Sequence, residues 1–97
     1  MEHEAEHFEV EVALLPSSET SRKTPIASGY RPNHRHPLTG EYFMGQLSFS
    51  GLVAPGETTH AQLRVVASPG QIAALKQFGS WTIWEGPHHV GSVRIIG

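Results

Sequence analysis

The chain has 97 residues, no cysteine and a formal net charge of -2, so we expect one domain with a single small core. The lack of cysteine excludes disulfides, zinc–thiolate sites and thiol nucleophiles, and it favours a reducing, cytoplasmic location. No apolar run approaches the roughly 20 residues of a membrane helix, and the acidic start is unlike a secretory signal. We therefore expect neither a membrane span nor a signal peptide.

Negative charge is concentrated at the start of the chain. Five of the nine acidic residues lie in the first eleven positions, which leaves four acids against all seven Lys and Arg in the remainder. Residues 1–7 are predicted to form a flexible acidic leader, and residues 8–97 a single domain. The mildly basic body permits an anionic partner, but it lacks the clustered cations that predict nucleic-acid binding.

Alternation of apolar and polar residues predicts strands along most of the chain. Residues 8–15, FEVEVALL, are predicted to form a half-buried strand ended by Pro16, and residues 17–24 a polar loop. The same period of two occurs in the segments EYFMGQLSFSG, THAQLRVV, SWTIWE and VGSVRII, and the last two are joined through EGPHHVG. With glycine and proline at the turns, this spacing predicts an all-β fold, a small barrel or sandwich.

Only the segment SPGQIAALKQFG has a helical pattern, and it is short. Residues 71–78 are expected either to form one or two helical turns, with Ile72, Leu75 and Phe78 on one face, or to cross over irregularly.

The alternation in SWTIWE assigns the two tryptophans to opposite faces of a strand. Trp81 shares a face with Ile83 and is predicted to lie in the core, whereas Trp84 points outward near His88 and His89. An exposed tryptophan there could stack on a base or anchor a protein interface, or it could simply cover the edge of the fold.

The histidines raise the question of metal binding. His34 and His36 lie two positions apart on one face of a strand, and they could form a metal site if they met His88 and His89 in space. The chain has no HExxH motif and no recurrent zinc spacing. We therefore favour solvated, pH-sensitive surface histidines, with His34 and His36 as weak metal candidates, and we expect no cofactor. Such histidines would strengthen binding of an anionic partner in mild acid.

Catalysis is not expected from this sequence. Serines, histidines and glutamates are present, but no GxSxG elbow or other ordered nucleophile motif occurs, and aspartate is absent. We predict that the protein is not an enzyme.

Several segments, taken in order, resemble one known domain. They are FEVEV, SRKTPIASGYRPN, TGEYFMGQLSFSG, APGE and the closing pair WEG and HVG. Their order resembles the C-terminal, third β-barrel domain of bacterial elongation factor Tu, over residues 8–97. The resemblance implies a small antiparallel β-barrel, in which Gly29 and Pro32 shape the second strand and fix Tyr30 and Arg31 between them.

The resemblance also implies a binding role without GTP hydrolysis. The chain has no GxxxxGK[ST] motif, whereas the third domain in that family contacts the T stem of aminoacyl-tRNA, the other domains and the exchange factor. The positions that match the RNA-facing segments of the family are Arg22, Lys23, Arg31, Asn33, Glu85 and Gly86.

The closing hairpin departs from the family where the family has arginines. This chain has Trp84 before EG, and Pro87, His88 and His89 after it. Since phosphate contacts supply much of the affinity for nucleic acids, we expect weakened tRNA binding at neutral pH. The sequence thus predicts a non-enzymatic module for a protein or RNA partner. A self-associating structural domain and, with less support, a histidine-based metal binder are the alternatives.

Overall fold

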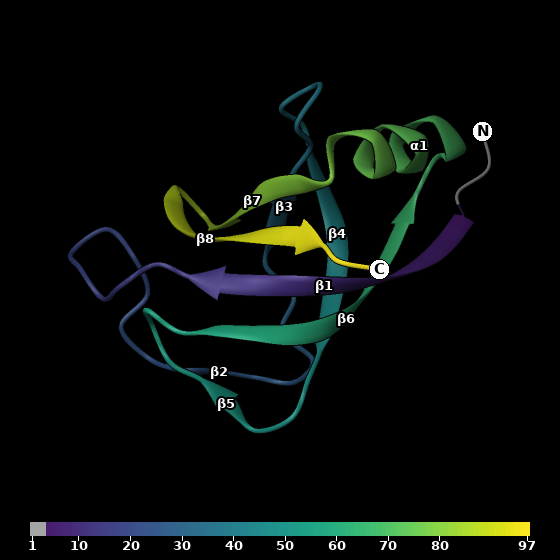
Figure 1. Ribbon diagram of the computed structural model, residues 1–97. Coiled ribbons are helices and arrows are strands. Elements are labelled where there is room, and N and C mark those ends of the chain that lie inside the picture. Colours follow the sequence, from purple (N-terminus) through teal and green to yellow (C-terminus); the bar gives the residue numbers. More distant parts are fainter. Residues whose placement is uncertain (1–3) are drawn as a thin grey trace.

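The computed structural model describes residues 4–97, and over this range the chain forms eight strands and one helix (Figure 1). They are β1 (Glu4–Leu14), β2 (Ile26–Ala27), β3 (Asn33–Arg35), β4 (Tyr42–Ser48), β5 (Leu52–Val53), β6 (Thr58–Ala67), α1 (Pro69–Phe78), β7 (Ser80–Glu85) and β8 (His88–Ile95). The all-β prediction is confirmed.

Six of these strands close into an antiparallel barrel, which confirms the predicted architecture. Around the barrel the strands follow the order β1, β6, β4, β3, β7 and β8, and β8 then pairs with β1. The short strands β2 and β5 pair only with each other and form a ribbon below the barrel in Figure 1. Closure gives each barrel strand a neighbour on both sides, so no barrel strand is an edge strand along its whole length.

The barrel interior is filled mainly by the apolar, inward-facing residues of the alternating strands, whereas β3 contributes His34. In β1 the inward residues are Phe8, Val10, Val12 and Leu14, as the sequence predicts. The core continues through the corresponding positions of the other elements, namely Phe43, Leu47, Ala61, Leu63, Val65, Ala67, Trp81, Ile83, Val90 and Val93, together with Ile26, Val53, Ile72 and Leu75.

Strand β1 begins earlier than the sequence suggests. Residues 4–7, which were expected in a flexible leader, pair with residues 64–67 at the end of β6. The long partner strand offers backbone donors and acceptors up to Ala67, and β1 satisfies them by extending outward. The first three residues of the expected leader lie outside the described residues.

The GYRP segment does not form a barrel strand, contrary to expectation. Gly29 has a positive φ of 94°, a left-handed conformation that favours glycine, and Tyr30 makes a single bridge to Leu47. Pro32 cannot donate a backbone hydrogen bond, so regular pairing starts only at Asn33, where β3 begins.

Helix α1 is longer than expected and is closed at both ends. Ser68 and Gln71 form a reciprocal capping box at its start, and Gly79, with φ 78°, ends it in the left-handed conformation. Ile72 and Leu75 are buried as predicted, whereas Phe78 is 50% exposed because the helix covers only one end of the barrel. Within residues 4–97, no helix combines the length and apolarity needed to cross a membrane.

Candidate functional site

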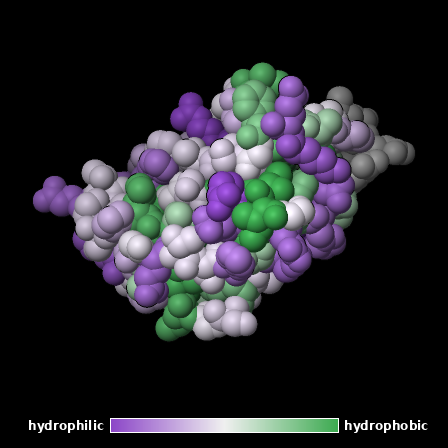
Figure 2. Space-filling model, viewed as in Figure 1, coloured by the Kyte–Doolittle hydropathy of each residue, from purple (hydrophilic) through white to green (hydrophobic). Residues whose placement is uncertain are grey.

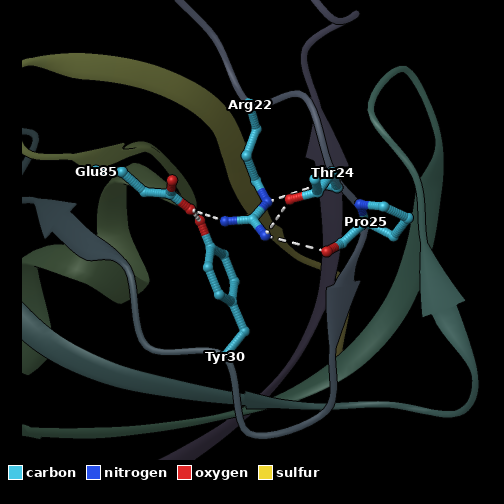
Figure 3. Close-up of polar contacts among 5 residues, drawn as sticks. All are labelled: Arg22, Thr24, Pro25, Tyr30 and Glu85. Atoms are coloured by element: carbon cyan, nitrogen blue, oxygen red, sulfur yellow. Dashed lines mark hydrogen bonds and ion pairs between the residues drawn. The ribbon is translucent and has the colours of Figure 1, made fainter.

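Two of the predicted site residues, Arg22 and Glu85, meet although they are far apart in sequence (Figure 3). Nη1 of Arg22 lies 2.5 Å from Oε2 of Glu85, and the hydroxyl of Tyr30 donates to the same carboxylate oxygen. On its other side the guanidinium donates to the backbone oxygens of Thr24, at 2.8 Å, and Pro25, at 3.0 Å.

This cluster ties the loop before β2 to the end of β7. Burial raises the pKa of the Tyr30 hydroxyl, and its hydrogen bond to the Glu85 carboxylate raises that pKa further, so the hydroxyl remains a donor. The charges of Arg22 and Glu85 satisfy one another. We call this cluster the clamp. Because its guanidinium is paired with Glu85, Arg22 is not available as an unpaired cation for an RNA phosphate.

Other predicted residues lie around the same hairpin without joining the clamp. Lys23 is exposed in the loop, and Gly86 and Pro87 form the tight turn between β7 and β8. His88 and His89 belong to β8 rather than to the connecting loop, and His88 is exposed.

His34 is buried in the barrel, contrary to the expected surface position. Its Nδ1 accepts the indole N–H of Trp81 at 2.9 Å, so the ring proton sits on Nε2, which donates to the Gly45 carbonyl at 3.1 Å. The imidazole also stacks on Phe43, with ring centroids 5.1 Å apart. Burial lowers the pKa of His34 to about 4, which keeps the ring neutral.

His36, which directly follows β3, is also buried. Its Nδ1 accepts the backbone N–H groups of Leu38, at 3.2 Å, and Thr39, at 3.4 Å, and Nε2 lies 3.3 Å from the Gln71 carbonyl. The predicted surface position is therefore wrong for both His34 and His36. Both rings use both nitrogens for the fold, and a metal would have to displace these partners. Residues 4–97 contain no group of three or more His, Cys, Asp or Glu that could hold a metal ion.

The two tryptophans lie on opposite sides of β7, as predicted. Trp81 is buried, whereas Trp84 is half-buried on the outer surface. The ring of His89 stacks on Trp84 with centroids 5.0 Å apart, and the guanidinium carbon of Arg35 lies 5.8 Å from the Trp84 ring centroid. Since β3 and β8 flank β7, these two side chains approach the indole from opposite neighbouring strands.

Strand register places one outward-facing residue from each of the six barrel strands in a line across the barrel. Each residue pairs with the next: Ala5, Val66, Met44, Asn33, Trp84 and His89. Three apolar side chains at one end of this line are followed by an amide and two aromatic rings. Met44 is 70% exposed and Val66 is 41% exposed, so the apolar part is open to solvent.

Three arginines border this line. Arg64 lies two residues before Val66, and Arg31 donates to the side chain of Gln46 at 3.4 Å. On the other side, Arg35 pairs in register with Tyr42, which is 52% exposed. We call this surface the Met44 face, and its members are the six residues of the line together with Arg31, Arg35, Tyr42, Gln46 and Arg64.

Acidic residues are absent from three strands that contribute to the Met44 face. Strands β3, β4 and β6 contain no Asp or Glu, whereas β1 carries a series of glutamates. Glu6 is 3.5 Å from Lys76, and Glu11 is 3.0 Å from Arg94. Strands β1 and β8 lie in front in Figure 1, and on this side Figure 2 shows hydrophobic patches broken up by hydrophilic side chains.

The sequence prediction therefore identified only part of this surface. Of the predicted residues, Arg31, Asn33, Trp84 and His89 come together on the Met44 face, whereas Arg22 and Glu85 form the clamp. Met44 and Val66 were missed. The available signal was an apolar residue on the outward phase of an alternating strand, where a polar one is expected.

No protein-family model matches the sequence, and neither does any curated protein. Function is therefore inferred from the site itself.

Proposed function

We propose that this protein is a non-enzymatic binding module that docks a partner protein on the Met44 face. The observation that carries the proposal is the exposure of Met44, at 70%, beside Val66 and Tyr42 on an outward sheet surface. Single exposed apolar residues are normal, but Met44 pairs in register with Val66, and Tyr42 lies two residues before Met44 on the same strand. A partner that covered them would remove adjoining apolar surface from water.

The composition of the Met44 face favours a protein over an RNA. Arginine, tyrosine, tryptophan and methionine are enriched at protein interfaces, lysine is depleted, and the face contains no lysine. An RNA site would need more cations than the three arginines provide, and Trp84 already contacts Arg35 and His89 from its own chain. Those contacts compete with stacking on a base.

A binding role also agrees with the resemblance to the third domain of elongation factor Tu. In that family the domain is itself a binding surface, and this chain lacks the P-loop motif for nucleotide. The buried histidines support a non-catalytic role, because His34 and His36 commit their ring nitrogens to the barrel.

The proposal is tested by affinity capture from a lysate of the source organism with the wild-type protein and two matched variants. Met44→Asp places a charge at the centre of the face, and Leu52→Asp does so on β5, where the leucine is 69% exposed. Both positions are solvent-exposed, so circular dichroism and thermal melting should match the wild type. We expect a defined protein that is retained by the wild type and Leu52→Asp and lost by Met44→Asp.

Ribonuclease treatment and light scattering distinguish the other occupants. Capture that disappears with ribonuclease, with a steep salt dependence, would assign the face to RNA and overturn the proposal. A wild-type dimer that Met44→Asp dissociates would assign the face to a second copy of the chain. Equal capture by both variants would show that the Met44 face is not the interface.

A further inference from the structure

Resting on the proposed function, we infer the chemistry of the partner: an acidic peptide segment whose carboxylate binds between Arg31 and Arg64 while a neighbouring aliphatic side chain packs on Met44 and Val66. These residues, with Gly45 and Gln46, line a shallow depression of about 240 Å³ on the outer surface of β4 and β6. The segment is the part of the partner that the depression recognises.

The polar side of the depression presents hydrogen-bond donors in a line. Gln46 pairs in register with Arg64 on β6, and its Oε1 accepts a hydrogen bond from Arg31 on the opposite side. Gln46 therefore lies between the two arginines, next to Arg64 on β6 and in contact with Arg31 on its other side. Both arginine side chains can only donate hydrogen bonds, and guanidinium groups bind carboxylates in a planar, bidentate manner.

The arginines of the depression have no acidic partner within the described chain. The ion pairs found over residues 4–97 are Arg22 with Glu85, Lys76 with Glu6 and Arg94 with Glu11. The β1 residues beside Arg64 and Val66 are His7 and Ala5, respectively, so the nearest strand adds no carboxylate to the depression. Its positive charge is therefore unbalanced locally and favours an acidic ligand.

The other side of the depression is apolar, and this favours a peptide ligand over a small inorganic or organic anion. Met44 and Val66 pair directly with each other, and both are exposed. A phosphate or free carboxylate would leave this surface wet, whereas an aliphatic residue next to the acid would cover it. Two guanidinium groups beside an apolar pair thus fit a peptide in which acidic and aliphatic residues adjoin.

The test is an NMR titration of the full chain, labelled with ¹⁵N, with two model peptides. One is acetyl-Leu-Glu-Leu-Glu-amide, and the other replaces both glutamates with glutamine. We expect shift changes at the amides of residues 44–46 and 64–66 with the acidic peptide and about tenfold weaker binding of the neutral one, which corresponds to one lost charged contact. Inorganic phosphate at the same concentration should not reproduce these shifts.

Variants connect the binding to the two arginines. The double substitution Arg31→Gln and Arg64→Gln should reduce the affinity for the acidic peptide to that for the neutral peptide. Lys23→Gln, which removes an exposed cation outside the depression, should leave it unchanged apart from a small effect of net charge. Equal affinity for the two peptides, or the same shifts with phosphate, would overturn the inference.

The outcome is separable from that of the proposed function. If capture from lysate depends on Met44 but the acidic peptide has no preference, the acidic ligand is wrong and the docking face stands. If the acidic peptide binds between the arginines but capture is the same for Met44→Asp and Leu52→Asp, the pocket chemistry stands and the proposed protein interface fails.

Discussion

The indole N–H of Trp81 donates to Nδ1 of His34 at 2.9 Å inside the barrel, and this contact defines the state of the histidine. The other ring nitrogen donates to the Gly45 carbonyl, so one imidazole on β3 connects β7 on one side with β4 on the other. A protonated ring would have no acceptor for its Nδ1–H, because the indole can only donate. The barrel therefore requires a neutral His34.

The first prediction is a loss of stability in mild acid. The unfolded chain has His34 at its ordinary pKa of 6.5, and the folded chain has it at about 4, so between these values only the unfolded state binds the proton. The free energy of unfolding should therefore fall as pH drops from 6.5 to 4, by about 1.4 kcal/mol per unit and about 3 kcal/mol in all from this group. Above pH 6.5 this contribution is complete and constant.

Urea unfolding between pH 7.5 and 4 measures this slope, and His34→Gln is the control. The glutamine keeps an acceptor for the Trp81 N–H but does not titrate, so the variant should be less stable at pH 7 and should show a flatter decline toward pH 4. The same slope in both proteins would mean that His34 does not carry the effect.

The second prediction concerns the donor. Trp81→Phe removes the indole N–H and leaves Nδ1 of His34 without its partner in the core, at an expected cost of about 1–3 kcal/mol, in addition to the lost packing. Trp84→Phe is the matched variant, because its N–H bonds to Thr82 at the half-buried surface, where water can replace the contact. Chemical denaturation followed by circular dichroism should show the larger loss for Trp81→Phe, and a larger loss for Trp84→Phe would contradict this assignment.

The third prediction uses three glycines with different surroundings. A Cβ at Gly91 would lie 2.3 Å from the Ala13 carbonyl oxygen, and one at Gly45 would lie 2.8 Å from Nε2 of His34 and 2.9 Å from Leu63 Cδ1. We expect Gly91→Ala and Gly45→Ala to destabilise the barrel by about 1–3 kcal/mol or more, with Gly91 the more severe because backbone must move. Gly70→Ala meets no atom within 4 Å and should be neutral or mildly stabilising.

Thermal melting of these alanine variants provides the comparison. A melting temperature for Gly91→Ala equal to that of Gly70→Ala would show that the close packing of β8 on β1 is not required.

The fourth prediction concerns the clamp between the loop and the closing hairpin. Glu85→Ala removes the partner of Arg22 and the acceptor of Tyr30, and we expect it to cost about 1–2 kcal/mol, since the pair is only partly screened from water. The loop should open more often, so trypsin should cleave after Arg22 and Lys23 several-fold faster than in the wild type.

Glu85→Gln and Glu19→Ala complete the clamp experiment. The glutamine keeps an acceptor for Tyr30 without the charge and should give an intermediate cleavage rate. Glu19 is exposed in the same loop, and its substitution should leave cleavage unchanged. Equal protection in Glu85→Ala and the wild type would show that the clamp does not hold the loop.

The sequence by itself determined which residues fill the barrel. Alternation in β1, β6 and β7 correctly predicts that Val10, Leu63 and Ile83 are buried while their polar neighbours face outward. It does so because a period of two is a local property of an extended strand with one buried face. The same rule places Trp81 inside and Trp84 outside. It fails for His34 and His36, since the short strand β3 has no apolar residues to show which of its faces is inward.

Only the tertiary structure decided what lies together on the surface. Met44 and Val66 become neighbours through the register of β4 with β6, and Arg22 meets Glu85 because the loop folds back on the hairpin at the end of β7. Strand order and register depend on how all six strands close the barrel, which is a non-local condition that no single segment encodes. The core follows from local patterning, whereas the Met44 face and the clamp follow from closure.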